Sequence, residues 1–357
     1  MPQGFYQLRV EKIVKETDDA VSIALQVPPP LMNQFEYLAG QYLTFYAEIN
    51  GEEVRRSYSV CSSPFLNKMP VIAVKKVTEG RMSTYMNESL KEGDLIDAMP
   101  PMGKFTLVPD ANKKAHYVLF GGGSGITPLY SILLTVLHQE PQSTLTLVYA
   151  NRNESSIIFK NQLEALEKQY ADRLNVVHCF EAPPANWHGL SGYLTTPIIH
   201  QLMRQYAPDP REAIYYICGP APMMQMVKSS LEMAGIFADH IKSEYFTATS
   251  SEPKSAPVVT ENEDATVPHE VHVEVYGKEH KITVKPGETI LSASQDAGLE
   301  PPFSCTVGVC TTCRAKVLAG KVHMDEREGL SDAEMDEGYV LTCQSHPLTD
   351  GVRVIYE

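Results

Sequence analysis

The 357-residue sequence lacks any apolar run that approaches the roughly 18 residues of a membrane-spanning helix. Its first segment, MPQGFYQLRVEKIVKE, has no apolar core of the kind that a secretion signal needs. Basic residues are outnumbered, with 30 Lys and Arg against 44 Asp and Glu, which argues against a nucleic-acid surface. A cytoplasmic protein of two or three globular domains, without membrane insertion, is therefore expected.

Cysteine is also scarce, and its placement is uneven. Three of the seven cysteines fall within SCTVGVCTTC, from Ser304 to Cys313. Without a secretion signal, such a group more often binds a metal or acts in catalysis than forms disulfides. Cys305, Cys310 and Cys313 give the spacing C-x4-C-x2-C, and Cys343 follows after 29 intervening residues. This is the plant-type pattern for a 2Fe-2S cluster.

The patterns of two other metal sites are missing. Structural zinc usually uses two C-x2-C or Cys/His pairs, and only one such pair is present. A Rieske centre needs histidines two residues after its cysteines, and none of the 11 histidines lies there. Gly308 suits a loop that must curve tightly around two irons. The sequence thus predicts a 2Fe-2S cluster, with zinc and plain core cysteines as the alternatives.

The segment around these cysteines resembles a plant-type ferredoxin from Glu270 to Glu357. Within it, EVHVEVYGKEHKITV alternates apolar and polar residues around Gly277, which predicts a hairpin. The next stretch predicts a helix that is capped by Thr289 and stops at Gly298. The resemblance implies an α+β domain of the β-grasp type, with the metal ligands Cys305, Cys310, Cys313 and Cys343.

Acidic residues are concentrated in the same segment, which holds 15 Asp and Glu against 8 Lys and Arg. Much of this charge lies in DEREGLSDAEMDEG. A solvated surface loop explains the pattern. The alternative is an acidic rim that steers a basic redox partner toward the cluster.

The first block of the chain, residues 1–108, consists of predicted strands. In AVSIALQV and YLTFYAEI apolar residues alternate with polar or small ones, so both are expected to be half-buried strands of an antiparallel β-barrel. RRSYSVCS lies in the same block, and its R-x-Y-S resembles the flavin-binding strand of the ferredoxin reductase superfamily. The resemblance implies that Arg56 pairs with the pyrophosphate of FAD, Tyr58 lies on the isoalloxazine face and Ser59 bonds near its reactive nitrogen.

A second stretch of this block, TEGRMSTYMNE, supports a flavin site. A helix that starts here would turn backbone N–H groups toward a phosphate, and a capped helix without a ligand is the alternative. The stretch matches the family's G-x-x-S, and PPMGKF resembles its P-x-G-x-F turn, which favours FAD over FMN. The resemblance assigns cofactor binding here to Gly80, Met82, Ser83 and Thr84.

Residues 113–246 alternate predicted strands and helices, which indicates an α/β domain with a parallel, doubly wound sheet. Strand HYVLF precedes GGGSGITPLYSILLTVL, where glycines let the backbone approach a pyrophosphate at a helix start. Pro128 occupies the place of the motif's third glycine, as a proline does in ferredoxin reductases. This resemblance implies that Thr127 approaches the nicotinamide and flavin rings. The nicotinamide cofactor is therefore expected at Gly122, Gly123, Ser124, Gly125, Thr127 and Pro128.

YYICGPAPMM is a third family motif, and it ends a strand where such sheets bind ligands. In the family, the cysteine of C-G-P lies by the nicotinamide carbon that releases hydride, which assigns binding roles to Cys218, Gly219 and Pro220. A buried strand cysteine is the alternative. SEYF resembles the family's terminal acidic and aromatic pair, so Glu244 and Phe246 are expected near the flavin. The residues expected at the catalytic centre are Tyr58, Ser59, Thr127 and Cys218.

The end of the second strand of this domain bears on the choice between NADPH and NADH. An NAD-binding fold normally has an acid there for the ribose hydroxyl, whereas this sequence has Asn151 and Arg152. Arg152, together with Ser155, would hold a 2′-phosphate. NADPH is therefore favoured, and NADH stays open because similar N-R turns occur in relatives that use it.

Composition divides the chain into an FAD domain at 1–108, an NAD(P)H domain at 113–246, a Ser-, Thr- and Pro-rich linker at 247–269 and the ferredoxin domain at 270–357. Hydride transfer delivers two electrons and an iron–sulfur cluster takes one, so a flavin must stand between them. The predicted route runs from NAD(P)H through FAD and the 2Fe-2S cluster to an external acceptor.

The domain order resembles the reductase components of bacterial multicomponent oxygenases, in particular the reductase subunits of phenylacetyl-CoA epoxidases and those that serve hydroxylases and desaturases. The resemblance implies a terminal oxygenase or similar redox protein as the partner. Two alternatives remain: an electron-transfer subunit of a flavin dehydrogenase, whose fourth cysteine normally follows the third much sooner, and a redox- or iron-sensing protein.

Overall fold

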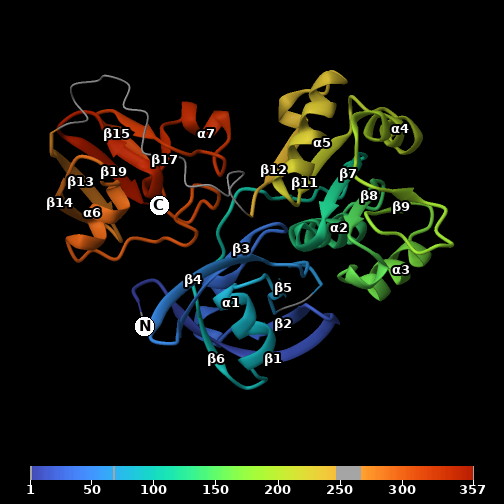
Figure 1. Cartoon of the computed structure of the whole chain (residues 1–357), viewed down its shortest axis with the longest axis horizontal. Helices are drawn as coiled ribbons and strands as arrows, with labels where there is room; N and C mark the ends of the chain where they lie inside the picture. The colour runs from blue at the N-terminus through green and yellow to red at the C-terminus, as the bar shows by residue number, and fades with distance from the viewer. Residues whose placement is uncertain (1, 67–68, 247–266, 357) are drawn as a thin grey trace. The chain divides into compact units, whose positions relative to one another are not determined.

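The computed structural model describes residues 2–66, 69–246 and 267–356 (Figure 1). Its larger compact unit comprises Tyr6–Val54 and Tyr58–Phe246, and its smaller unit comprises the described residues of 1–5, 55–57 and 247–357. Most of the linker expected at 247–269 lies outside the described residues. Within the described ranges, no helix has the length and apolar character needed to cross a membrane.

The first sheet has six antiparallel strands in the order β4-β3-β6-β1-β2-β5. A bridge between Val60, just after β4, and Ile72 in β5 joins the two edges of this sheet, as the expected barrel requires. The strands are β1 (Tyr6–Thr17), β2 (Ala20–Gln26), β3 (Tyr42–Ile49), β4 (Glu52–Ser59), β5 (Val71–Lys75) and β6 (Leu95–Ala98).

The barrel interior follows from the alternation seen in the sequence. Val21, Ile23 and Leu25 of β2 are buried together with Leu43 and Phe45 of β3. Short helical segments add apolar side chains to the same core, among them buried methionines. These segments are η1 (Pro29–Phe35), α1 (Arg81–Thr84) and η2 (Tyr85–Ser89).

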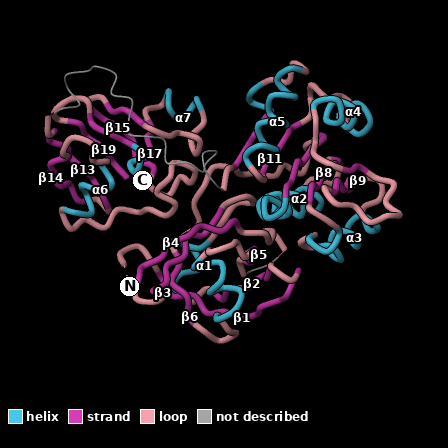
Figure 2. Tube along the Cα trace, viewed as in Figure 1, coloured by secondary structure: helices cyan, strands magenta, loops and turns pink. Residues whose placement is uncertain are grey.

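The second sheet has six parallel strands in the order β10-β9-β8-β7-β11-β12. Figure 2 shows how helices alternate with these strands. The strands are β7 (His116–Gly122), β8 (Thr144–Asn151), β9 (Leu174–Phe180), β10 (Leu190–Ser191), β11 (Ile214–Cys218) and β12 (Ile241–Glu244). The helical segments are η3 (Gly123–Gly125), α2 (Ile126–Gln139), η4 (Glu154–Ser156), α3 (Lys160–Gln169), α4 (Thr196–Tyr206), α5 (Ala221–Met233) and η5 (Ala238–His240).

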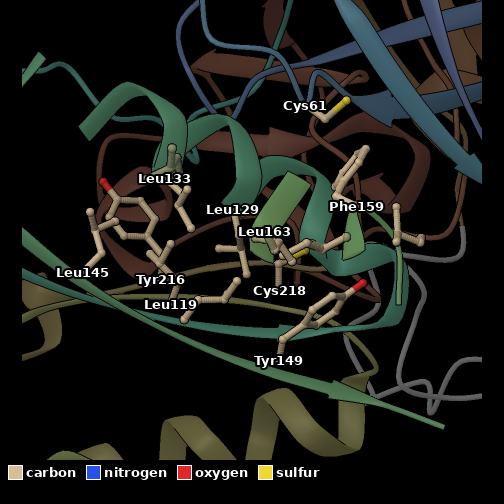
Figure 3. Packing of buried hydrophobic residues seen from close by; sticks show 14 of the residues in the cluster. Cys61, Leu119, Leu129, Leu133, Leu145, Tyr149, Phe159, Leu163, Tyr216 and Cys218 are labelled. Atoms are coloured by element: carbon tan, nitrogen blue, oxygen red, sulfur yellow. The ribbon is translucent and has the colours of Figure 1, made fainter. Parts of the chain in front are cut away.

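This sheet is covered on both faces, which explains its continuous apolar strands. Leu119 of β7 packs in one cluster with Leu129 of α2 and Leu163 of α3, and Figure 3 shows these side chains together. Phe120, the next residue of β7, belongs to a second cluster with residues of α4 and α5. Helices α2 and α3 therefore cover one face of the sheet, and helices α4 and α5 cover the other. Strand order reverses between β7 and β11, where doubly wound sheets bind ligands.

The smaller unit contains a mixed five-stranded sheet in the order β14-β13-β19-β15-β17 and a separate pair, β16 and β18. As expected, the first two strands form a hairpin, and Thr289 caps the next helix by accepting a hydrogen bond from Ser292 N. The elements are β13 (His269–Val275), β14 (Lys278–Val284), α6 (Ile290–Asp296), β15 (Arg314–Ala319), β16 (Val322–Met324), α7 (Asp332–Asp336), β17 (Tyr339–Leu341), η7 (Thr342–Gln344), β18 (Ser345–Pro347) and β19 (Val352–Tyr356). The three sheets confirm the expected fold classes.

Candidate active site and cluster site

The loops that follow β7 and β11 meet at the carboxyl edge of the parallel sheet. A Cβ atom added to Gly125 would lie 2.2 Å from the carbonyl oxygen of Cys218. One added to Gly219 would lie 2.9 Å from the backbone nitrogen of Gly122. Because real Cβ atoms do not approach backbone so closely, only glycine fits these positions. The structure thus brings the glycine motif and the C-G-P motif together at the switch point, a contact that the separate motifs did not predict.

The remaining residues of these two motifs shape the same edge. Thr127 is 2% exposed, and its hydroxyl donates to Ser124 O at 3.1 Å, so this group closes the first helical turn. Pro128 is buried at the start of α2. Pro220 lies against Gly122, where an added Cβ would come within 2.6 Å of its Cδ. The surface offered to a ligand here is therefore mainly backbone, as a pyrophosphate site requires.

A buried acid lies beside the C-G-P cysteine. Strands β11 and β12 pair Cys218 with Glu244, and the hydroxyl of Ser59 donates to Glu244 Oε2 at 3.1 Å. Burial raises the pKa of the Glu244 carboxyl to about 8, so it is protonated at neutral pH. Burial also raises the pKa of the Cys218 thiol well above its ordinary value. Ser59, Cys218 and Glu244 thus form an uncharged polar group.

The residues expected to contact the flavin ring and pyrophosphate differ in exposure. Arg56 is exposed on β4, and its Nη1 donates to Arg55 O at 2.7 Å. Tyr58 is half-buried and tilted against Phe45, with ring centroids 6.1 Å apart. Phe246 is 37% exposed and lies two residues after the end of β12. A guanidinium matches the geometry of a phosphate, and an aromatic ring can cover the face of a planar ring system.

The segment from Gly80 to Thr84 forms the short helix α1 and the turn before it. The hydroxyl of Ser83 donates to Gly80 O at 3.1 Å and accepts from Val77 N at 3.2 Å, so it holds the turn. Met82 is buried in the barrel core, and Thr84 is half-buried. A Cβ on Gly80 would lie 2.3 Å from a methyl group of Val77. This segment can therefore meet a phosphate through its backbone and through Thr84.

The end of β8 carries the residues expected near the adenosine ribose. Arg152 is exposed, whereas Asn151 is buried. Asn153 caps η4, and its Oδ1 accepts hydrogen bonds from Ser156 N and from the Ser155 hydroxyl. Both residues expected to hold a 2′-phosphate are exposed, and the Ser155 hydroxyl already donates to Asn153 Oδ1.

The four expected metal ligands converge as two pairs in the smaller unit. Hydrogen bonding to Cys310 lowers the pKa of Cys305 to about 5, and hydrogen bonding to Cys313 lowers the pKa of Cys343. No three His, Cys, Asp or Glu side chains among the described residues are gathered as a single-ion site would need. Two cysteine pairs are the arrangement that a cluster of two irons requires.

The loop that carries three of these cysteines is held by backbone groups. Gly308 has φ +78°, and a Cβ there would lie 2.8 Å from Cβ of Glu326. Gly308 O accepts a hydrogen bond from Gly329 N at 2.8 Å. The backbone N–H of Cys310 donates a hydrogen bond to Cys305 Sγ at 3.4 Å. The tight curvature predicted at Gly308 is confirmed, and N–H groups face the sulfurs, as in sites that stabilise iron-bound thiolates.

One residue at the carboxyl edge of the parallel sheet, the proposed nicotinamide edge, was missed by sequence reasoning. The hydroxyl of Tyr149 donates to the carbonyl oxygen of Gly123 at 2.9 Å. In the sequence, Tyr149 occupies one position in an apolar strand. A core tyrosine and a tyrosine that bonds a distant loop give the same pattern, so no sequence signal distinguishes them.

The chain combines a barrel that carries a flavin motif, a parallel sheet with a glycine-lined edge and a domain with four paired cysteines. Together these features define an NAD(P)H-dependent flavin and iron–sulfur reductase. Three family models match the chain in this order. They are the oxidoreductase FAD-binding domain over residues 7–107, the oxidoreductase NAD-binding domain over 119–229 and the 2Fe-2S iron-sulfur cluster binding domain over 273–348. FAD and a 2Fe-2S cluster are thus the cofactors, and NAD(P)H is the electron donor.

Full-length relatives agree with this class. The chain is 35% identical to a subunit of the 1,2-phenylacetyl-CoA epoxidase of Escherichia coli, with 99% of this chain and 98% of the relative covered. It is 36% identical to the ferredoxin reductase component of 3-ketosteroid-9-alpha-monooxygenase of Rhodococcus rhodochrous, covering 97% and 95%. The chain therefore belongs to the family of ferredoxin reductases in which FAD- and NAD-binding domains are joined to a 2Fe-2S domain.

A solved structure shows the same fold. Phthalate dioxygenase reductase, described as a modular structure for electron transfer from pyridine nucleotides to a 2Fe-2S cluster, matches with a TM-score of 0.58 at 23% identity. The match covers 99% of this chain and 98% of that one. All three modules are thus shared in one chain.

Proposed function

We propose that this chain is the reductase of a multicomponent oxygenase and passes electrons from NADPH through FAD and the 2Fe-2S cluster to that oxygenase. The observation that carries the proposal is the presence, on one chain, of paired cluster cysteines and a glycine-lined nicotinamide edge. The names of the relatives, a component of an epoxidase and one of a monooxygenase, support an oxygenase as acceptor. A phenylacetyl-CoA epoxidase, another hydroxylase or a desaturase fits this role.

The flavin is assigned to the barrel residues and to the aromatic residue after β12. Arg56 is accessible for a pyrophosphate, and Tyr58 presents a ring beside the buried Ser59. Met82 would contribute its backbone only, because its side chain is in the core. The proposed FAD-binding residues are Arg56, Tyr58, Ser59, Gly80, Met82, Ser83, Thr84 and Phe246.

The nicotinamide dinucleotide is assigned to the carboxyl edge of the parallel sheet, and the cluster to the four cysteines. Glycines that admit no Cβ at this edge support a backbone cradle for the pyrophosphate. The proposed dinucleotide-binding residues are Gly122, Gly123, Ser124, Gly125, Thr127, Pro128, Arg152, Cys218, Gly219 and Pro220. The proposed cluster ligands are Cys305, Cys310, Cys313 and Cys343.

Bound FAD supplies the step between two-electron hydride transfer and one-electron transfer to the cluster. The chain's own contribution is to position groups and hold protons. The carboxyl of Glu244 has a pKa of about 8, so it keeps its proton at neutral pH, and the Ser59 hydroxyl donates a hydrogen bond to this carboxyl. Cys218 stays a neutral thiol because burial raises its pKa. The proposed catalytic residues are Tyr58, Ser59, Thr127 and Cys218, and the neutral Cys218 and Glu244 add no charge to this group.

NADPH is the proposed donor because of the residues at the end of β8. Asn151 occupies the place where NAD-binding folds carry an acid, and Arg152 offers an exposed guanidinium for a 2′-phosphate. Arg152→Ala should raise KM for NADPH about tenfold or more, the loss expected for a charge-assisted hydrogen bond, and leave KM for NADH unchanged. Arg204→Ala, an exposed arginine on α4, is the control. A strong preference of the wild-type protein for NADH would contradict the assignment.

The acidic segment 325–337 is proposed as part of the surface that receives the partner. Glu334 is excluded from this role because it bonds Arg314 at 2.8 Å and completes a capping box with Ser331. Asp332, Asp336 and Glu337 are exposed. Exposed acids near the cluster in sequence would attract a basic protein over roughly a Debye length.

Charge reversal tests this surface. Asp332, Asp336 and Glu337 changed together to Lys should slow NADPH-driven reduction of cytochrome c, a basic protein, roughly tenfold at low salt and much less at high salt. Reversal of three other exposed acids, Asp172, Glu212 and Asp239, is the control. Equal rates for the two triple variants at low salt would contradict the proposed rim.

Domain boundaries and location complete the proposal. We place the FAD domain at 1–108, the NAD(P)H domain at 113–246, the linker at 247–269 and the ferredoxin domain at 270–357, in line with the matched ranges. The cytoplasm is the proposed location, because none of the seven cysteines, all of them among the described residues, forms a disulfide, which suits a reducing compartment.

The acceptor is tested by reconstitution. The holoprotein should co-purify with an oxygenase and support its NADPH-dependent turnover, and omission of the reductase should abolish that turnover. Reduction of cytochrome c by NADPH without support for any co-purified oxygenase would contradict the oxygenase assignment. Bound FAD that NAD(P)H does not reduce would favour a sensor instead.

A further inference from the structure

Tyr149 joins the middle of the parallel sheet to the glycine loop. Its side chain is fully buried in the cluster formed by α2, α3 and the sheet (Figure 3). Its hydroxyl donates to Gly123 O at 2.9 Å. The same oxygen accepts the backbone N–H of Ile126, which follows η3. Both lone pairs of this carbonyl are therefore occupied from within the protein.

The Tyr149 hydroxyl is suited to act only as the donor in this contact. Burial raises the pKa of Tyr149 above its ordinary value, so the hydroxyl keeps its proton throughout the physiological range. The partner, a backbone carbonyl, can only accept. The direction of the bond is thus fixed, and the carbonyl of Gly123 is held toward the interior.

The planar peptide unit transmits this orientation to the other side of the loop. In a trans peptide, the carbonyl of one residue and the N–H of the next point in opposite directions. An inward carbonyl on Gly123 therefore turns the N–H of Ser124 outward. Gly123 has φ +52° and no atom within 4 Å of an added Cβ, so the loop is open on its outer side. Ser124 is half-exposed there.

We propose that Tyr149 is a positioning residue for the nicotinamide dinucleotide, and that its hydroxyl locks the Gly123–Ser124 peptide so that the Ser124 N–H faces the pyrophosphate. This inference rests on the proposed assignment of the glycine loop to NAD(P)H. Loss of the hydroxyl leaves the Gly123 carbonyl held by the Ile126 N–H alone, so the peptide rotates more easily, and an inverted peptide would present a carbonyl oxygen to an anion. Binding is then weakened without any change in the residues that touch the ligand.

A second tyrosine provides a matched control for this role. Tyr215 is also fully buried in the same sheet, and its hydroxyl donates to a backbone carbonyl, that of Pro210, at 2.8 Å. Pro210 precedes the amino end of β11, so this bond lies away from the carboxyl edge. Tyr149→Phe and Tyr215→Phe each remove one buried hydroxyl-to-carbonyl bond. A general cost in stability should be similar in the two variants.

The test uses the oxidised, flavin- and cluster-loaded protein. The dissociation constant of NADP⁺, followed by the flavin difference spectrum, should rise about fivefold in Tyr149→Phe and stay within about twofold of wild type in Tyr215→Phe. Adenosine 2′-phosphate, which lacks a pyrophosphate, should bind Tyr149→Phe as it binds wild type. Flavin reduction at saturating NADPH should change less than KM.

Three outcomes would overturn the inference. One is equal NADP⁺ binding by the two variants, and another is an equal loss for NADP⁺ and adenosine 2′-phosphate in Tyr149→Phe. The third is a wild-type protein that binds neither NADP⁺ nor NAD⁺, which would also remove the proposed function. The first two leave the proposed function intact, so the failures are distinguishable.

Discussion

The cluster loop and the nicotinamide edge are built from different chemical groups. The proposed cluster ligands are four cysteine side chains, and two residues of their loop, Thr306 and Gly308, lie in the left-handed region. The nicotinamide edge is made mainly of backbone, with Gly125 and Gly219 admitting no side chain because another strand's loop lies against them. Loss of one ligand should therefore destroy the first site, whereas the second should fail through steric change.

The largest effect is expected from removing a cluster ligand. Cys343→Ser leaves three thiolates, and the loss should exceed the roughly 10- to 100-fold that outer-shell partners contribute to metal affinity. NADPH-driven reduction of cytochrome c should fall to background while reduction of ferricyanide, which accepts electrons from the flavin, continues. Cys179→Ala, a buried cysteine of β9, should keep the full cluster signal. A retained spin signal in Cys343→Ser would contradict the ligand assignment.

The nicotinamide edge should respond next most strongly. Gly125→Ala places a Cβ 2.2 Å from Cys218 O, which is backbone and cannot give way without moving β11. A destabilisation of about 3 kcal/mol is expected for such overpacking. Gly123→Ala in the same loop has open space and should cost about 1 kcal/mol for its positive φ. Denaturant unfolding measures both, and equal losses would argue against close contact between the two loops.

A smaller steric effect is expected in the cluster loop. Gly308→Ala combines a left-handed φ of +78° with a Cβ contact of 2.8 Å to Glu326, for a cost of about 2 kcal/mol. Gly277→Ala, in the hairpin turn at φ +71° with nothing within 4 Å, should cost about 1 kcal/mol. The rate at which visible absorbance is lost in the presence of a chelator should rise in the first variant and not in the second.

A pH-dependent effect is expected from the buried acid Glu244. Glu244 has a raised pKa, about 8 against an ordinary 4.5, so the folded protein keeps a proton that the unfolded chain releases. Wild type should therefore lose stability relative to Glu244→Gln as the pH rises from about 4.5 to about 8, with no further change above that. Tm measured across this range checks it, with Glu212→Gln as an exposed control. If wild type instead lost stability relative to Glu244→Gln as the pH falls, the burial of this carboxyl would be contradicted.

The sequence by itself determined the parts whose chemistry depends on residue type and spacing. The proposed ligands Cys305, Cys310, Cys313 and Cys343 are recognisable in the sequence because cluster binding requires thiolates and their spacing reflects the loop that carries them. Alternating and continuous apolar strands gave the antiparallel and parallel sheets, because burial on one or two faces leaves that pattern.

Only the tertiary structure decided which groups meet across the fold. Ser59 and Glu244 are 185 positions apart, and their hydrogen bond depends on how the barrel and the parallel sheet pack. In the sequence, Tyr149 cannot be distinguished from other core residues. The structure shows that its hydroxyl donates a hydrogen bond to the carbonyl oxygen of Gly123. Sequence patterns report burial and chain direction, whereas a contact between distant backbone and side chain exists only once the sheets and loops are assembled.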